Sequence, residues 1–300
     1  MAERYLTAQE VADLLKIKKN TVYNMIKKGS LRAVKVGKQF RVAEGNVRAV
    51  LGQGARAARA GYQPPTGGER FVVCGQDALL DLLCGSANTA LGEPFFFRSH
   101  MGSYNGLHAM YQGQADAATA HLWDMETDTY NLPFIPKLLP GERVAVFHLV
   151  GRTVGIYVAA GNPKGIVQIE DFARPDVTMV SREKGSGIRV LADSLFARAG
   201  IAPRAVHGYE TVAGSHLAAA ACVAGGQADC ALGNQKAALQ TPAVDFLPLR
   251  VEQYDLVLRQ DDLERPQVGT LLGVLRSPEF RAALDALGGY DTRDLGKQLR

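Results

Sequence analysis

Residues 177–188 read V-T-M-V-S-R-E-K-G-S-G-I, and this stretch decides the expected fold. Val177–Val180 is a short, largely apolar run, which predicts a buried strand. The run passes through the turn at 181–187, and residues 188–199 continue with helical spacing. A strand followed by a glycine-serine turn and a helix is one β-α unit. We therefore predict a fold assembled from such units.

The same order of elements recurs along residues 70–300. We predict strands over 70–74, 95–99, 115–120, 144–150, 153–159, 177–180, 228–232 and 246–249, and helices over 78–84, through 107 and 110, and over 188–199. Repeated units of this kind predict an α/β fold with mainly parallel sheets. We expect two lobes around a ligand, because turns of this type place the free N–H groups of helix starts in a crevice.

Two glycine-serine turns mark the expected ligand site. Gly102-Ser103 and Gly185-Ser186-Gly187 each open a predicted helix, and facing one another they would enclose a small oxyanion or polar molecule. Inward-pointing arginines would add positive charge, whereas Asp77 would repel an oxyanion unless it faces away at a helix start. Two histidines lie where strands meet loops or helices, where an imidazole donates to a ligand or serves the structure alone. The predicted ligand-binding residues are Asp77, Gly102, Ser103, Tyr104, His121, Arg182, Gly185, Ser186, Gly187, Arg189, Ser215 and His216.

The positive charge of the chain is concentrated at its N-terminal end. The 300 residues include 34 Lys and Arg against 30 Asp and Glu, a net charge of +4. Residues 1–60 hold 13 of the bases and 4 of the acids, which gives +9 there and −5 in the remainder. A compact basic block is typical of a surface that binds a polyanion. The two parts of the chain are therefore expected to serve different purposes.

The basic part has the pattern of a small helical DNA-binding fold. Thr7 and Glu10 form a capping box ahead of apolar residues at helical spacing, which predicts a first helix of about nine residues. A second helix is expected from Lys19 or Asn20 to Gly29. Two short helices joined by a tight turn make a helix-turn-helix.

A β-hairpin is expected directly after the two helices. Residues 31–36 and 39–42 alternate in polarity on either side of Gly37-Lys38, so the hairpin tip would form a basic wing, and a third helix follows from Asn46. The second helix and the wing supply donors for phosphates and base edges. The predicted DNA-binding residues are Lys18, Lys19, Asn20, Thr21, Tyr23, Asn24, Lys35, Lys38 and Arg41.

A linker separates the two parts. Gly52–Glu69 contains five Gly and two Pro in 18 residues, a composition that favours an extended connection. We predict a winged helix-turn-helix domain over 1–51, a linker over 52–69 and a ligand-binding domain over 70–300.

Composition argues against several classes of protein. No apolar stretch approaches the ~20 residues that span a bilayer, and no apolar core of a secretion signal follows the first residues. The four cysteines form no C-x-x-C pair and no zinc spacing, so we expect reduced thiols in a cytoplasmic protein. The histidines show no metal-binding helix pattern, and no nucleophile elbow or P-loop appears. We therefore expect neither a metal, nor a cofactor, nor enzyme activity.

Residues 4–51 resemble the winged helix-turn-helix of excisionase and MerR-like DNA-binding domains. The resemblance rests on L-T-x-x-E-V-A-x-x-L, N-T-V-Y, G-x-L and V-G-x-x-x-R.

Residues 70–292 resemble the periplasmic-binding-protein-like domain, in the cytoplasmic form attached to helix-turn-helix regulators and to molybdopterin-biosynthesis proteins. The motifs that carry this resemblance lie at 121–124, 161–166, 182–189, 208–210, 215–218, 226–233 and 253–256. It implies a two-lobed fold that closes about a hinge, with relatives that bind molybdate or tungstate. The chain departs from that pattern at Ile188, where a threonine is expected, and at residues 74–77, which lack a serine.

These observations predict a ligand-responsive DNA-binding transcriptional regulator. We expect a cytoplasmic homodimer that binds double-stranded DNA and senses a small molecule, with molybdate or tungstate as the candidate, in an interlobe cleft. Two alternatives stay open: an enzyme that uses the cleft, and an excisionase-like architectural DNA-binding protein with no small ligand.

Overall fold

The computed structural model describes residues 5–15, 19, 22, 23, 26, 31, 33–36, 39–43 and 70–300. The chain divides into two compact units, Met1–Gln63 and Pro64–Arg300.

The smaller unit contains a three-stranded sheet in the order β1-β3-β2 beside a helix. Its elements are β1 (Tyr5–Thr7), α1 (Ala8–Leu15), β2 (Val34–Val36) and β3 (Gln39–Ala43). The predicted hairpin is confirmed, because β2 and β3 pair antiparallel with Val36 opposite Gln39. The pairing of β1 with β3 was not predicted, since three residues carry too short a pattern to be assigned.

The first helix begins as the capping box predicts. The Glu10 N–H donates to Thr7 Oγ1 at 3.3 Å, and the Thr7 N–H donates to Glu10 Oε2 at 2.7 Å. Val11 and Val22 are buried in the small core of this unit. The predicted second helix lies largely outside the described residues, and the third lies wholly outside them.

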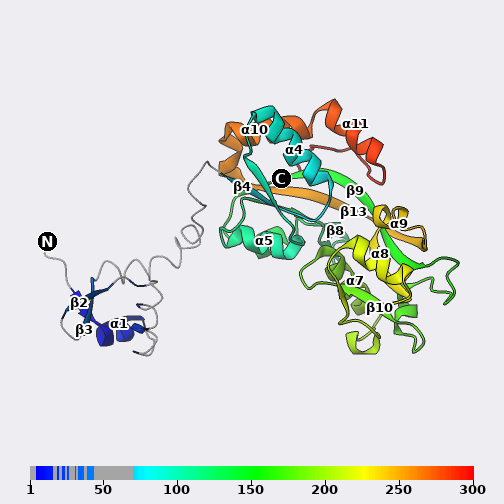
Figure 1. The fold of residues 1–300 in the computed structure, drawn as a ribbon, viewed down its shortest axis with the longest axis horizontal. Coiled ribbons are helices and arrows are strands. Elements are labelled where there is room, and N and C mark those ends of the chain that lie inside the picture. Colours follow the sequence, from blue (N-terminus) through cyan, green and yellow to red (C-terminus); the bar gives the residue numbers. More distant parts are fainter. Residues whose placement is uncertain are drawn as a thin grey trace. The chain divides into compact units, whose positions relative to one another are not determined.

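The larger unit is a mixed α/β domain (Figure 1). Its strands are β4 (Phe71–Cys74), β5 (Phe96–Ser99), β6 (Ala117–Ala120), β7 (Trp123–Asp124), β8 (Thr129–Tyr130), β9 (Val144–Ala159), β10 (Met179–Arg182), β11 (Val212–Ala213), β12 (Cys230–Asn234) and β13 (Val244–Arg259). Its α-helices are α4 (Leu79–Leu91), α5 (Ser103–Tyr111), α6 (Ile135–Leu138), α7 (Gly187–Arg198), α8 (His216–Ala224), α9 (Gln235–Leu239), α10 (Pro266–Leu275) and α11 (Pro278–Leu287). The 3₁₀ helices are η1 (Ile169–Ala173), η2 (Pro203–Ala205) and η3 (Gln260–Glu264).

One eight-stranded sheet runs through this unit in the order β11-β10-β12-β9-β13-β6-β4-β5. Strands β4, β5 and β6 with helices α4, α5, α6, α10 and α11 form lobe A, and strands β10, β11 and β12 with helices α7, α8 and α9 form lobe B. Parallel pairing holds within each lobe, at β4-β5, β4-β6, β10-β11 and β10-β12. The β-α units predicted from the sequence therefore build both lobes.

The prediction of two separate strands over 144–150 and 153–159 is wrong, because the chain forms one 16-residue strand, β9. Gly151 does not end the strand, since its N–H donates to the Asp291 carbonyl at 2.9 Å and so remains paired. β9 pairs antiparallel with the equally long β13, and both strands pass from lobe A into lobe B. The sheet is therefore mixed rather than mainly parallel, with β9 and β13 as the hinge strands.

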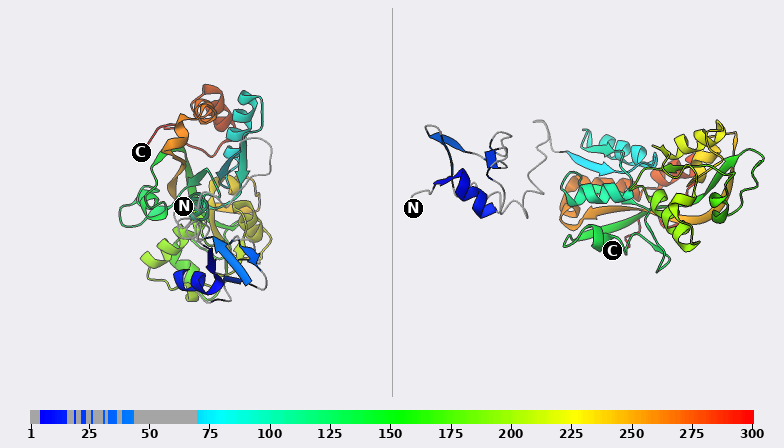
Figure 2. Two further views of the ribbon diagram at one scale, coloured as in Figure 1. Left: turned by 90° about the vertical axis from the view of Figure 1, so that its left-hand side faces the viewer. Right: turned by 90° about the horizontal axis from the view of Figure 1, so that it is seen from below.

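Helices cover both faces of the sheet in both lobes, which produces four apolar cores. In lobe A, α4, α10 and α11 pack on one face and α5 and α6 on the other. Figure 1 shows α5 on the opposite side of the sheet from α4, and Figure 2 shows α4 beside the C-terminal helices from two further sides. In lobe B, η1 and α7 cover one face and α8 and α9 the other. Strands covered on both faces are largely apolar, as β9 is apart from His148, Arg152 and Thr153.

Short polar side chains start the helices. Ser186 and Ser215 accept from the N–H groups of Arg189 and Ala218, which caps α7 and α8. At α4, Asp77 Oδ1 accepts from the Leu79 N–H at 2.9 Å. These helix starts follow the carboxyl ends of β10, β11 and β4, so they gather where the two lobes meet.

The substitution Gly155→Ala tests how closely the two hinge strands approach each other. A Cβ at this position would lie 2.1 Å from the Leu247 carbonyl oxygen, so Gly155→Ala must displace β13. We expect a loss of about 1–3 kcal/mol in the unfolding free energy of the larger unit, measured in urea. Gly269→Ala is the matched control, because that position in α10 faces open space and should gain up to about 1 kcal/mol. Equal effects of the two substitutions would contradict the packing described here.

Candidate functional site

A cavity of about 210 Å³ lies between the two lobes beside the hinge strands. Its walls come from the ends of β4, β6 and β12, from the starts of α4, α5, α8 and α9, and from β9 and β13. The lining residues are Gln76, Asp77, Ala78, Met101, Gly102, Ser103, Thr119, His121, Arg152, Ser215, His216, Leu217, Asn234, Lys236, Ala237, Gln240, Tyr254 and Tyr290. Both lobes and the hinge therefore contribute to one enclosure.

The starts of three longer helices meet at this cavity. Asp77 and Ala78 precede α4, Ser103 is the first residue of α5, and His216 is the first residue of α8. A helix N-terminus carries roughly half a positive elementary charge and N–H groups without intrahelical partners. The convergence of these ends favours a bound anion.

A chain of buried charges crosses the cavity wall. Arg152, which is 4% exposed, donates from Nη1 to Asp77 Oδ2 at 2.6 Å, and its Nη2 lies 2.5 Å from Glu252 Oε1. Glu252 Oε2 lies 2.8 Å from His121 Nδ1. The guanidinium carbon of Arg152 lies 4.0 Å from the centre of the Tyr254 ring. A buried charge needs such partners, so Asp77 and Glu252 hold the arginine in place.

Both carboxyl groups are ionised at neutral pH. Burial alone would raise the pKa of Glu252, but Arg152 and His121 outweigh burial and lower that pKa to about 2. Burial also opposes the ionisation of Asp77, and Arg152 together with the Leu79 N–H still lowers its pKa. The charge of Arg152 is thus already balanced by the protein.

Two nitrogen atoms at the cavity keep free hydrogen-bonding capacity. Among the residues that the structure describes, neither Arg152 Nε nor His216 Nδ1 has a hydrogen-bond partner, and both atoms are buried. Burial lowers the pKa of His216 well below its usual value, and Arg182 and Arg152 lower it further, so this imidazole is neutral. A buried polar atom without a partner is costly, which favours a ligand that supplies one.

The structure brings half of the predicted ligand-binding residues to the cavity. Asp77, Gly102, Ser103, His121, Ser215 and His216 line it. Asp77 lies at a helix start and lines the cavity, and its carboxylate is occupied by Arg152, the Leu79 N–H and the Tyr290 hydroxyl.

The two glycine-serine turns contact each other directly. A Cβ on Gly102 would lie 2.7 Å from Ser186 Cα, and the Tyr104 N–H donates to the Gly185 carbonyl at 3.0 Å. Gly187 approaches the His121 ring equally closely, and Tyr104 itself is 44% exposed. These turns hold the lobes together, and the cavity lies beside them rather than between them.

The two predicted arginines hold loops instead of lining the cavity. Arg182 donates from Nε to the Ala213 carbonyl at 2.8 Å and from Nη2 to Gln76 Oε1 at 2.9 Å. Arg189 donates to Ser181 Oγ at 2.9 Å and stacks on Tyr209, 3.9 Å from the ring centre. The positive charge at the cavity comes from Arg152 and Lys236, which the sequence did not single out.

The sequence analysis did not predict several residues that line the cavity or pair with those that do. Arg152 is the one Asp, Glu, Lys or Arg in the 16-residue strand β9, and that contrast is the signal that could have found it. Glu252, its buried partner, does not itself line the cavity and carries no such signal among the other charged residues of β13. Tyr290 carries no such signal, because it reaches the cavity from the segment after α11. The remaining unpredicted lining residues are Gln76, Ala78, Met101, Thr119, Leu217, Asn234, Lys236, Ala237, Gln240 and Tyr254.

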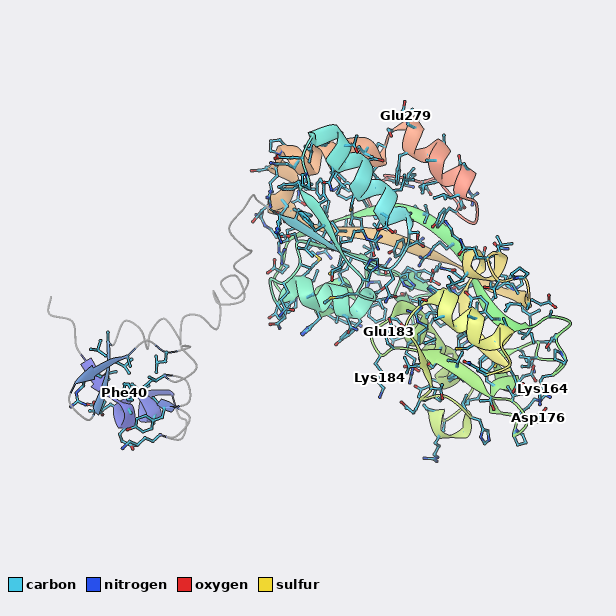
Figure 3. The ribbon with its side chains drawn as sticks, viewed as in Figure 1. Phe40, Lys164, Asp176, Glu183, Lys184 and Glu279 are labelled. Carbon is cyan, nitrogen blue, oxygen red and sulfur yellow. The ribbon has the colours of Figure 1, made fainter. Side chains whose placement is uncertain are left out.

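Four of the nine predicted DNA-binding residues lie in the described part of the smaller unit. Lys19 is exposed, and Tyr23 is 39% exposed with its ring 6.2 Å from that of Phe40. Figure 3 labels Phe40 in this unit. Lys35 lies in β2, and Arg41 lies half-buried in β3. The other predicted contacts lie outside the described residues: Lys18, Asn20, Thr21, Asn24 and Lys38.

Two features are absent from the part of the chain that the structure describes. No helix in this part of the chain is long and apolar enough to cross a bilayer. Within the same residues, no group of three or more His, Cys, Asp or Glu is placed to hold a metal ion.

The substitution Glu252→Gln tests the charge chain. It leaves Asp77 as the counter-charge of Arg152, so we expect a loss of about 3 kcal/mol in unfolding free energy at pH 7. The folded pKa of Glu252, about 2, lies below the unfolded value of about 4.3, so the wild type loses this stability as pH falls between the two. Urea unfolding from pH 7 to pH 3 should show the gap between variant and wild type narrowing. Glu264→Gln, at an exposed position, is the control, and a gap independent of pH would contradict the pairing.

Comparisons with known proteins give the family. Residues 86–276 match the model of the PBP superfamily domain, and residues 5–55 match a helix-turn-helix domain. The chain is 39% identical to the uncharacterized protein YvgK of Bacillus subtilis (strain 168), over 97% of this chain and 96% of the relative.

Solved structures share the fold at low identity. A putative phosphate ABC transporter substrate-binding protein from Clostridium perfringens covers 74% of this chain and 99% of its own, with 11% identity and a TM-score of 0.55. Full-length BenM covers 94% of each chain, with 13% identity and a TM-score of 0.51. The domain content is that of a DNA-binding regulator with a ligand-binding domain rather than of an enzyme. The chain belongs to the PBP superfamily and carries an N-terminal helix-turn-helix domain.

Proposed function

We propose that this protein is a one-component transcriptional regulator whose effector is a small oxyanion bound in the cavity between its lobes. The observation that carries the proposal is the meeting of three helix starts with Arg152, whose Nε lacks a partner among the described residues. Donors without acceptors, in an enclosure shared by two lobes, favour an anionic ligand over a cation or an apolar molecule.

The charge balance supports an anion that is recognised mainly by hydrogen bonds. The formal charges of Arg152 and Lys236 are cancelled by those of Asp77 and Glu252, so the helix starts supply the excess positive potential. The cavity, about 210 Å³, exceeds the roughly 150 Å³ that hold a benzene molecule in an engineered cavity. It has room for one tetrahedral oxyanion, and molybdate or tungstate is our candidate. The structural relative from Clostridium perfringens has phosphate bound, a ligand of the same geometry.

Effector binding acts on DNA through lobe closure. A ligand that contacts both lobes stabilises the closed state by its extra affinity for that state. In a cytoplasmic homodimer, closure would change the spacing of two helix-turn-helix heads, which read half-sites about 34 Å apart. This account needs no chemical turnover of the ligand.

Titration with molybdate, tungstate and sulfate, followed by the melting temperature, tests which of these anions the cavity binds. At a hundredfold excess over its Kd, a specific ligand should raise the melting temperature of the larger unit by about 5–10 °C. His216→Ala should reduce that rise, because His216 Nδ1 is a cavity atom without a partner in the described chain. His207→Ala is the matched control at an exposed position of lobe B and should leave the rise intact. No rise with any anion would reject the oxyanion effector.

The DNA-binding surface has its own test. If Lys19 contacts phosphate, Lys19→Ala should weaken binding to all duplex sequences and reduce the slope of log K against log salt by about 0.9. Lys137→Ala removes the same charge from an exposed position of the larger unit and serves as the control. Fluorescence anisotropy at several salt concentrations measures both, and equal slopes for Lys19→Ala and wild type would remove Lys19 from the interface.

A further inference from the structure

The segment after α11 pairs with a hinge strand. Gly151 and Asp291 exchange two backbone hydrogen bonds of 2.9 and 2.8 Å, and the His148 N–H donates to the Lys297 carbonyl at 2.8 Å. Further along, the Leu299 N–H donates to the Val146 carbonyl at 2.7 Å. Residues 291–299 thus lie along β9 and contact it by two isolated bridges on either side of a turn, and this placement brings Tyr290 to the cavity.

Tyr290 connects the two lobes through its hydroxyl group. The hydroxyl accepts from Lys236 Nζ of lobe B at 3.0 Å and donates to Asp77 Oδ1 of lobe A at 2.6 Å. Lys236 Nζ also lies 4.3 Å from the centre of the Tyr290 ring. We call Tyr290, Lys236 and Asp77 the tyrosine clasp. Because Asp77 also binds Arg152, the clasp is continuous with the buried charge chain.

A separate set of contacts joins the lobes at the glycine-serine turns. The Gln76 side chain donates to Glu183 Oε1 at 2.8 Å and accepts from Arg182 Nη2 at 2.9 Å. The Tyr104 N–H to Gly185 bond belongs to the same contact, and Figure 3 shows Glu183 and Lys184 where the lobes meet. The lobes are therefore held together by protein contacts at two places, one where the glycine-serine turns meet and one at Tyr290.

We propose that the tyrosine clasp sets the affinity of the cavity for its effector by holding the lobes closed and by positioning Lys236. This inference rests on the proposed function. Tyr290 acts as a positioning residue, because its hydroxyl already donates to Asp77 and accepts from Lys236. Its contribution is to the closed population: the apparent Kd equals the intrinsic Kd divided by the fraction of competent molecules.

The removal of either partner of the clasp should weaken effector binding. Tyr290→Phe, which removes both hydrogen bonds of the hydroxyl, should raise the Kd for molybdate about tenfold, and Lys236→Met, which removes one of these bonds together with a cavity charge, should raise it at least as much. The double variant should lose less than the sum of the two single losses, because both substitutions break the contact between Tyr290 and Lys236. Isothermal titration measures the three affinities. Tyr111→Phe and Lys137→Met repeat the substitutions at exposed positions and should bind as the wild type does.

Hydrogen exchange without any anion provides the second readout. The Tyr104 amide is protected by its bond to Gly185 across the lobes, so a broken clasp should accelerate its exchange severalfold, while amides within α10 stay unchanged. Additive losses in the double variant, or unchanged exchange at Tyr104, would overturn the proposal. If no anion binds the wild type, the oxyanion effector is rejected, and the exchange rates alone decide whether the clasp closes the lobes.

Discussion

The ion pairs that Arg152 forms with Asp77 and Glu252 fix the side chains around the cavity. Its guanidinium is buried where the paired hinge strands pass from lobe A into lobe B. A buried charge requires carboxylates within ion-pair distance. Asp77 supplies one from the end of β4, and Glu252 supplies the other from β13. Because Glu252 also holds His121 and Asp77 also holds Tyr290, parts of the chain far apart in sequence are fixed around one space.

This pairing also shapes the selectivity expected of the cavity. An unpaired arginine would attract anions by charge alone, whereas Arg152 is neutralised before any ligand arrives. The remaining attraction comes from N–H groups and dipoles with fixed directions. For the anionic effector proposed above, discrimination would therefore depend on the positions of the oxygen atoms and on the size of the ion.

Local patterns predicted the elements well, and contacts between distant elements poorly. The capping box at Thr7 and Glu10 and the order of β-α units are visible in short windows, so they could be predicted. Residues 151–152 lie between two predicted strands, and nothing near them in the sequence shows that Gly151 pairs with Asp291, 140 positions away in the chain. The turns at Gly102 and Ser186 were predicted to face each other, but only the packing of the lobes shows that they touch.

The residues at the cavity were likewise predicted only where a short stretch of sequence carries the signal. Ser103, Ser215 and His216 were found because helix starts after strands have a local signature. The ion pair of Arg152 with Glu252 is visible only once β9 and β13 are paired, since Glu252 is one of several charges in its strand. Tyr290 could not be predicted, because nothing near it in sequence indicates a return to the hinge.

The contacts of residues 291–299 with β9 have one more consequence. Without it, the lobe A half of β9 would present unpaired backbone groups at Val146, His148 and Gly151 along an open edge. Exposed edges of this kind template pairing with other chains and lead to aggregation. The segment that carries Tyr290 to the cavity therefore also protects the domain from self-association through its sheet.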